Sequence, residues 1–371
     1  MKFVKDAEKN SVALRIRKTY QDADMSSHTV MTDDVFSYVD FYFKTHKKNI
    51  KDSNGKPLRQ NHSFYWGQAR NLYNAAKILP IESSALPMYY CMLNAVKAYL
   101  LYCANDCKSL LENFNNHGLG ENPSNNSETD SLKLENIMVF RKERGVFCEF
   151  SKKEDKNFDS LWKSRKENSV SLKELISQLP FVHSAYVYTY KIPRKEEKFI
   201  PLEANHSPKF MYSKENKIRL VADIDKHYFK QNATSIPNEI LETVPKQLAL
   251  NPDKENAFQL YSRQTFKKAD VPKVYNEYRR LFVYINADKR LWYLRKEDGS
   301  NLSRINTMSL EMAIAHRFSE IVRYKSEQMQ ELLSGKENWL IHECLSLMLD
   351  QFMDEISCEI TKQEIMHTRI K

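Results

Sequence analysis

Residues 64–102 read FYWGQARNLYNAAKILPIESSALPMYYCMLNAVKAYLLY, and this stretch decides the fold. In its first part, apolar side chains recur at three- and four-residue intervals between Trp66 and Ala76, with polar side chains between them. That period predicts an amphipathic helix over residues 65–79. Pro80 ends the helix, because proline lacks an amide hydrogen and disfavours helical geometry in the preceding residue.

The second part of the stretch predicts a helix that is apolar on nearly every side. Ser83 or Ser84 can cap it, and Pro87 fits its first turn. A helix of this kind either spans a membrane or forms the centre of a bundle. Asn94, Lys97 and several tyrosines are costly in lipid, so we expect the bundle centre and no membrane attachment. Asn94 and Lys97 then either find partners in the fold or face a ligand.

Length and composition describe a globular protein. The 371 residues, 42% of them hydrophobic, suffice for one large domain or two ordinary ones. The seven glycines form no GxGxxG and no GxxxxGK[ST] motif, which argues against dinucleotide oxidoreductases and P-loop NTPases. The formal charge of +9, from 57 basic and 48 acidic residues, favours an anionic partner such as nucleic acid.

The cysteines and the N-terminal residues indicate a cytoplasmic protein. The six cysteines are scattered through hydrophobic segments without a CxxC pair, so we expect reduced thiols, no metal site and no cofactor. The first 18 residues are charged throughout and lack the apolar run of a signal sequence.

Changes of period along the chain divide it into four parts. We expect a lead-in or docking segment over 1–60, a helical core over 61–114, a β-rich region over 131–304, and C-terminal helices over 305–371 that pack on the helical core. The polar residues 115–130 form a loop at the boundary. This order predicts an α+β fold in which the two helical ends enclose a mainly antiparallel β insertion.

Within the β-rich region, alternation predicts individual strands. The expected elements are a hairpin of 137–140 and 146–150, a strand over 181–192, strands at 199–202, 209–212 and 217–224, a helix over 239–250, and a hairpin over 275–294. After Met308 the helical period returns: one helix ends at Ser334 and Gly335, and the next buries Ile341, Leu345, Met348, Phe352 and Ile356.

Four segments together resemble the YaaC-like bacterial proteins. They are WGQARNLYNAAKILP at 66–80, ESSALPMYYCMLNAVKAYLL at 82–101, His117-Gly118-Leu119, and Ser319-x-x-x-Arg323-Tyr324-Lys325 with Trp339. The resemblance covers about half of the chain and is strongest at its two ends. It implies a bacterial origin, but the family offers no agreed catalytic residues to transfer.

The helical pair also resembles HEPN domains, many of which are ribonucleases of toxin and phage-defence systems. That resemblance implies an arginine and a histidine about five to seven residues apart on one helix. Arg70-Asn71 begins such a motif, but Ala75 and Ala76 stand where a histidine is required. A nuclease site would therefore be assembled from separate segments, with His117, Arg323, Arg70 and Lys97 as catalytic candidates.

A row of ionisable side chains on the C-terminal helix allows two interpretations. His316, Glu320, Arg323 and Glu327 follow one another on a single helix face. They could transfer protons or hold a phosphate, or they could form a solvated ion-pair face.

Aromatic and basic residues of the β-rich region suggest a nucleic-acid platform. Bases stack on aromatic rings and neighbouring cations neutralise phosphates. The candidates on the predicted strand and hairpin are Tyr186, Tyr188, Tyr190, Lys191, Arg194, Arg280, Arg290 and Trp292. The same aromatic residues could instead pack in the core or form a protein interface.

Two functional hypotheses follow. The first is a binding or assembly subunit that contacts single-stranded nucleic acid, serves in phage defence, and pairs with the product of a neighbouring gene or with a second copy of itself. The second is a HEPN-like or non-standard nuclease, acting on RNA in preference to DNA. We favour the first, in which the protein is not an enzyme.

Overall fold

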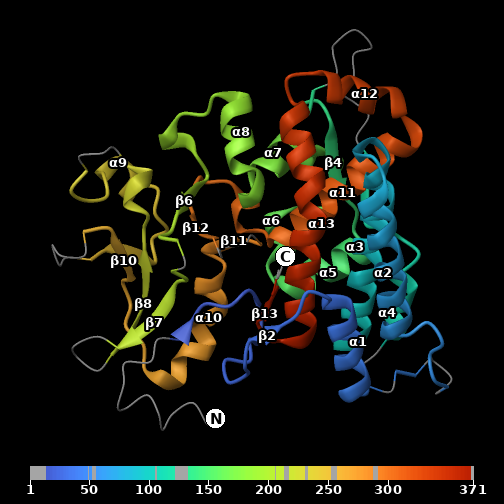
Figure 1. Cartoon of the computed structure of the whole chain (residues 1–371), viewed down its shortest axis with the longest axis horizontal. Coiled ribbons are helices and arrows are strands. Elements are labelled where there is room, and N and C mark those ends of the chain that lie inside the picture. Colours follow the sequence, from blue (N-terminus) through green and yellow to red (C-terminus); the bar gives the residue numbers. More distant parts are fainter. Residues whose placement is uncertain are drawn as a thin grey trace. The chain divides into compact units, whose positions relative to one another are not determined.

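The computed structural model describes residues 14–368, apart from 49, 52–55, 105–106, 122–132, 205, 213–216, 230–232, 252–256 and 287–290. The chain forms two compact units (Figure 1). The helical unit comprises Thr32–Lys191 and Arg304–Thr361, and the sheet unit comprises the described residues of Met1–Met31, Ile192–Ser303 and Lys362–Lys371. The fold is α+β, as predicted.

The helical unit contains most of the long helices and one small sheet. Its elements are α1 (Val35–Thr45), α2 (His62–Ile78), α3 (Ile81–Cys103), α4 (Lys108–Asn113), β3 (Leu119–Glu121), β4 (Met138–Arg141), α5 (Val146–Glu154), α6 (Phe158–Leu161), β5 (Val170–Ser171), α7 (Leu172–Ser177), α8 (His183–Tyr190), α11 (Thr307–Tyr324), α12 (Ser326–Ser334) and α13 (Asn338–Thr361).

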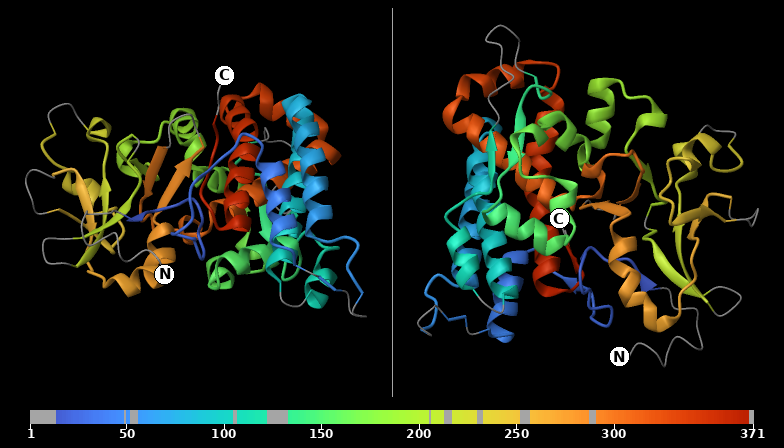
Figure 2. Two further views of the ribbon diagram at one scale, coloured as in Figure 1. Left: turned by 60° about the horizontal axis from the view of Figure 1, so that its bottom comes forward. Right: turned by 180° about the vertical axis from the view of Figure 1, so that it is seen from behind.

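Helix α3 is the centre of the helical unit. Helices α2, α11 and α13 pack against it, and the two views of Figure 2 show these long helices side by side. Most side chains of α3 are buried, including Met92, Val96 and Tyr99. The predicted bundle centre is confirmed. None of the helices within the described residues has the length and apolar character needed to cross a membrane.

The start of α3 differs from the predicted one. The helix begins at Ile81, because the carbonyl of Pro80 accepts hydrogen bonds from the amides of Ser83 and Ser84. Neither serine is the cap, and Pro87 lies inside the helix, beyond its first turn.

The C-terminal helices bury their predicted stripe but are divided differently. Ile341, Leu345, Met348, Phe352 and Ile356 of α13 are all buried, as expected. The single helix predicted up to Ser334 is instead two helices, α11 and α12. Lys325 separates them, because its backbone leaves the helical region with φ −143°.

Two predicted strands of the helical unit are helices. Residues 146–150 belong to α5, because Gly145 starts that helix with φ 132° and the carbonyls of Asn116 and His117 accept the first free amides of Val146 and Phe147. Residues 183–190 form α8, which follows a 3₁₀ turn at Pro180–Val182 and ends at Lys191 in the left-handed conformation. Residues 133–191 thus cluster with the helices, whereas the sequence grouped them with the β-rich region.

The sheet unit carries the antiparallel β-structure. Its elements are β1 (Leu14–Arg15), β2 (Val30–Met31), β6 (Phe199–Pro201), β7 (Lys209–Tyr212), β8 (Ile218–Asp223), α9 (Asn238–Leu241), β9 (Leu248–Leu250), β10 (Gln259–Ser262), α10 (Val271–Arg279), β11 (Phe282–Ile285), β12 (Leu291–Arg295) and β13 (Ile365–Met366). A five-stranded sheet has the order β1-β7-β8-β10-β9, a three-stranded sheet has the order β11-β12-β6, and β13 pairs with β2 in parallel.

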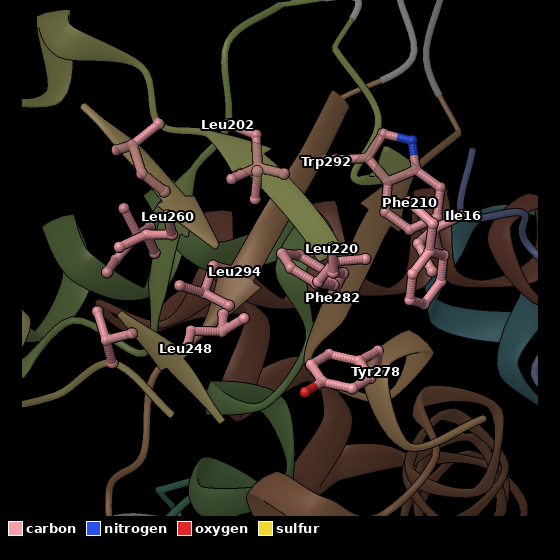
Figure 3. Close-up of a cluster of buried hydrophobic side chains, with 14 of the residues drawn as sticks. Ile16, Leu202, Phe210, Leu220, Leu248, Leu260, Tyr278, Phe282, Trp292 and Leu294 are labelled. Atoms are coloured by element: carbon pink, nitrogen blue, oxygen red, sulfur yellow. The ribbon is translucent and has the colours of Figure 1, made fainter. Parts of the chain in front are cut away.

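The core of the sheet unit lies among these strands and helix α10. Figure 3 shows Phe210, Leu220, Leu260 and Trp292 among its buried side chains. The strands predicted near 199–202, 209–212 and 217–224 are present. The helix predicted over 239–250 is wrong: only Asn238–Leu241 is helical, and Leu248–Leu250 is a strand.

The hairpin predicted over 275–294 is shorter than expected. Strands β11 and β12 form it, with Phe282 opposite Leu294. Residues 275–279 belong to α10 instead. Pro272 lies in the first turn of α10, where its missing amide hydrogen costs nothing, although the Asp270 side chain makes no capping hydrogen bond.

Candidate functional site

The loop that carries His117 is held by backbone contacts to the start of α5. The carbonyl of Asn116 accepts from Val146, that of His117 accepts from Phe147, and that of Gly118 accepts from Lys142, at 2.9, 3.0 and 2.9 Å. Gly118 has φ 90°, a conformation that favours glycine. The position of His117 is therefore fixed by the backbone and not by its own side chain.

The His117 ring is half-buried and is oriented by Tyr89 of α3. The Tyr89 hydroxyl lies 2.6 Å from Nδ1 of His117. Burial raises the pKa of Tyr89 well above its ordinary value, so the hydroxyl stays protonated and available for this hydrogen bond. Within the described residues Nε2 of His117 makes no hydrogen bond, and this atom is not fully buried. Nε2 is therefore the ring nitrogen left to meet a ligand.

His316 of α11 lies beside this pair and is neutral. Its ring centroid is 5.0 Å from that of Tyr89 and 5.6 Å from that of His117. Burial, reinforced by the charges of nearby groups, lowers the pKa of His316 to about 3. Its Nδ1 lies 3.7 Å from a Glu320 oxygen, too far for a hydrogen bond, and burial raises the pKa of Glu320. His316 supports the His117 ring without adding charge.

Three cations lie close enough to His117 to affect its pKa. Burial lowers the pKa of His117, and Lys97, Lys142 and Arg323 lower it further, in that order. His117 is consequently neutral at physiological pH. Lys142 and Arg323 are exposed, whereas Lys97 is half-buried.

None of these three cations has a carboxylate oxygen within 4.0 Å in the described part of the chain. The Lys97 ammonium instead lies over the rings of Tyr65 and Phe114, at 5.4 and 5.3 Å from their centroids. Burial lowers the pKa of Lys97. Placing a lysine here without a counter-charge is costly unless an anion joins it.

The nearby carboxylates are bound to other cations. Glu121 of β3 lies 2.7 Å from Arg317 and 2.7 Å from Lys325, and Glu320 lies 3.2 Å from Arg317. Burial opposes ionisation of Glu121, but the hydrogen bonds and charges of these two cations outweigh it and lower its pKa. This network neutralises the acids beside the site and leaves its cations uncompensated.

We call His117, Tyr89, Lys97, Lys142 and Arg323 the His117 centre. The His117 centre combines a neutral imidazole with three positive charges that act on it. A phosphodiester oxygen suits the cations, and the imidazole can accept or hold a proton. Among the described residues there is no group of three or more His, Cys, Asp or Glu side chains arranged to hold a metal ion.

Three of the four catalytic candidates come together in this centre. His117, Lys97 and Arg323 lie in different segments of the sequence and converge in the helical unit. Arg70 does not join them: it lies 3.0 Å from Asp34 near the start of α1 and is not among the cations that affect the pKa of His117. Asn94 donates to the Tyr90 carbonyl within α3.

The four ionisable residues predicted to share one face of the C-terminal helix do not form a single row. His316 is buried and Arg323 is exposed, so the row is not a uniformly solvated face. Glu327 falls in α12, beyond the break at Lys325.

The tyrosine platform predicted for residues 181–192 does not form a strand face. Tyr186 and Tyr190 of α8 are one helical turn apart, with ring centroids at 4.8 Å, and the Tyr190 hydroxyl bonds Glu337. Tyr188 is 74% exposed and its ring centroid is 6.1 Å from that of Trp339. Lys191 is exposed at the C-cap of α8.

The remaining predicted nucleic-acid residues fall in the sheet unit or outside the described residues. Trp292 is buried in the core. Arg194 lies over the ring of Tyr228 at 5.0 Å, and Arg280 is half-buried at the end of α10. Arg290 lies outside the described residues. Of the eight residues, Tyr186, Tyr188, Tyr190 and Lys191 belong to the helical unit, and Arg194, Arg280 and Trp292 belong to the sheet unit.

Tyr89, Lys142 and the buried His316 are parts of this environment that the sequence did not identify as such. Tyr89 is one of several tyrosines in an apolar helix, and Lys142 is one of many lysines. The helical spacing of His316 and Arg323, which places them on one helix face, was the only sequence pattern that linked His316 to the site.

Comparison with known proteins identifies the family of the chain. No curated protein and no solved structure matches the chain significantly. The family model described as YaaC-like Protein matches residues 30–360, which include α2, α3, the His117 loop, α11, α12 and all but the last residue of α13. No such match supports the HEPN resemblance. The chain belongs to the YaaC-like protein family.

Proposed function

We propose that this protein is a binding subunit that holds a phosphodiester of single-stranded nucleic acid at the His117 centre. One observation carries the proposal: a neutral, half-buried histidine lies among three cations that have no carboxylate partner in the described residues. Phosphate oxygens supply the missing negative charge, and the net charge of +9 favours encounter with a polyanion.

The half-buried Lys97 favours a specific site over a diffuse positive surface. Its ammonium is partly desolvated against two aromatic rings, so a bound phosphate gains a stronger interaction there than at an exposed lysine. The exposed Lys142 and Arg323 allow a strand to reach it from solvent.

Fluorescence anisotropy with labelled single-stranded RNA and DNA tests this function. We expect affinity to fall steeply with salt, and each lost phosphate contact to reduce the slope by about one. Lys97→Met and Arg323→Ala should weaken binding, whereas Lys47→Met and Arg59→Ala, at exposed positions outside the centre, should not. The absence of binding at low salt, or equal losses in the controls, would rule out the proposal.

Cleavage of RNA is a second candidate function, favoured by the neutral state of His117. In this reaction the 2′-hydroxyl oxygen attacks the adjacent phosphorus, its proton passes to His117, and the bond to the 5′ oxygen breaks as water protonates that oxygen. The three cations stabilise the charge that develops on the phosphoryl oxygens.

An RNase assay distinguishes cleavage from binding alone. His117→Ala and Arg323→Ala should abolish cleavage and leave circular dichroism unchanged, while His342→Ala, at an exposed position on α13, should cleave normally. Cleavage that survives both site variants would exclude this catalytic centre. Binding without cleavage would leave the protein as a subunit.

The cellular setting is part of the proposal. All six cysteines lie in described positions and none forms a disulfide, which fits the reducing bacterial cytoplasm. We place the protein in phage defence with a partner encoded by a neighbouring gene, by analogy with HEPN systems. Co-purification with that gene product, and phage plating with and without the gene, test these two points. Loss of the complex and unchanged plating would contradict them.

A further inference from the structure

A second polar site lies in the helical unit, between β4, α5, α6 and the segment that follows α6. It is a pocket of about 810 Å³, within the range of about 300–1,000 Å³ typical of small-molecule sites. Every lining residue is charged or polar: Arg141, Glu143, Lys152, Asp159, Lys163, Ser164, Arg165, Glu167 and Asn168. No residue of the His117 centre lines it.

Arg141 is a fixed donor in the wall of this pocket. Its side chain is only 4% exposed, and Nη2 lies 2.6 Å from an Asp159 oxygen. Its Nε donates to the Trp162 carbonyl, and the guanidinium lies 5.3 Å from the centroid of the Phe158 ring. Asp159 also pairs with Lys152 at 3.1 Å. One wall of the pocket is therefore held in place before any ligand arrives.

Four other lining residues are charged and form no ion pair among the described residues. Lys163 and Arg165 are exposed, flank Ser164, and have no carboxylate oxygen within 4.0 Å in the described residues. Glu143 and Glu167 likewise have no cation partner among those residues. The pocket thus offers two cations and a hydroxyl for an anionic group, and two carboxylates that accept hydrogen bonds from hydroxyl or amino groups.

We propose that this pocket binds a phosphorylated small molecule that also carries hydroxyl or amino groups, of the class of a nucleotide. Lys163, Arg165 and Ser164 hold the phosphate. Glu143, Glu167 and Asn168 hold the hydroxyl and amino groups. The carboxylates disfavour a bare polyanion, so a nucleotide binds more tightly than inorganic pyrophosphate of similar charge.

Isothermal titration of the full chain with ATP, AMP and inorganic pyrophosphate tests the proposal. We expect ATP or AMP to bind and pyrophosphate to bind more weakly. The double variant Lys163→Ala/Arg165→Ala should lose about tenfold or more in affinity, because each residue makes a charge-assisted contact. The matched double variant Lys47→Ala/Arg59→Ala removes the same charge outside the pocket and should bind as the parent does.

Two results would overturn the inference: no binding of either nucleotide at millimolar concentration, or equal losses in both double variants. Tighter binding of pyrophosphate would overturn the assigned role of the carboxylates. Thermal unfolding without ligand shows that each variant is folded, which we expect because all four side chains are exposed. His117→Ala should leave nucleotide affinity unchanged, so failure at this pocket and failure at the His117 centre are distinguishable.

Discussion

Replacement of Gly145 by alanine should destabilise the helical unit and displace the His117 loop. Gly145 has φ 132° and ψ 172°, a region that only glycine adopts readily. A Cβ at this position would lie 2.4 Å from the amide nitrogen of Gly118, 2.6 Å from its Cα, and 2.8 Å from the carbonyl oxygen of Asn116. All three atoms belong to the backbone on either side of His117, so no side chain can rotate to relieve the contact.

The expected loss of stability in Gly145→Ala has two sources. The unfavourable backbone conformation costs about 1–3 kcal/mol, and overpacking against a fixed backbone costs about another 1–3 kcal/mol. We therefore expect Gly145→Ala to lower the free energy of unfolding by about 2–6 kcal/mol, a large share of the about 5–15 kcal/mol of an ordinary domain.

Urea unfolding followed by circular dichroism measures this loss. Gly67→Ala is the matched control, because Gly67 lies inside α2 and a Cβ there meets no atom within 4 Å. That variant should gain about 0.5–1 kcal/mol from helix propensity. A Gly145→Ala protein within about 1 kcal/mol of the parent would refute the close approach of the Gly145 and Gly118 backbones.

Three further predictions concern buried ionisable groups. Lys97→Met should raise the pKa of His117, because it removes one of the three cations that lower it; an unchanged pKa in an NMR titration would show that Lys97 is distant. Burial and the neighbouring Glu355 raise the pKa of Glu311 well above its ordinary value. Folding therefore favours the protonated acid, and stability falls as pH rises from about 4.3 through the folded pKa. Glu311→Gln should accordingly gain more stability over the parent at pH 8 than at pH 4, and an equal difference in urea unfolding at both pH values would contradict this. Tyr99→Phe removes a buried 2.7 Å hydrogen bond to Glu154 and should cost about 1–3 kcal/mol; unchanged stability would show that water or another group satisfies the carboxylate.

The helical half of the fold could be predicted because its signals are long and consistent. The apolar surface of α3 and the apolar stripe of α13 extend over many turns. Both helices bury these surfaces in the bundle, as their helical spacing predicts. The break at Lys325 could not be predicted, since no proline or glycine marks it.

The secondary-structure predictions fail in short segments where the spacing of a helix and that of a strand fit equally well. Tyr186, Tyr188 and Tyr190 alternate as a strand would, but the first and last of them also stand one helical turn apart. A left-handed Lys191, which sequence reasoning does not anticipate for a non-glycine residue, ends the helix. In α5 the capping carbonyls come from the His117 loop, a tertiary contact that the local sequence does not encode.

The candidate site was predictable in its residue types but not in its assembly. His117, Lys97 and Arg323 could be selected from the loop position, the unexplained lysine and the terminal motif. Their convergence depends on the packing of α11 against α3 and on the backbone around Gly145, which no local pattern specifies.

The most direct measurement is NMR of the His117 ring in the full chain during titration with a single-stranded oligonucleotide. In the free protein we expect a His117 pKa below the ordinary value of about 6.5. Bound phosphate should shift the ring resonances and raise that pKa, because the anion offsets the charges of Lys97, Lys142 and Arg323. Ring resonances and a pKa that do not change at saturating oligonucleotide would contradict phosphate binding at the His117 centre.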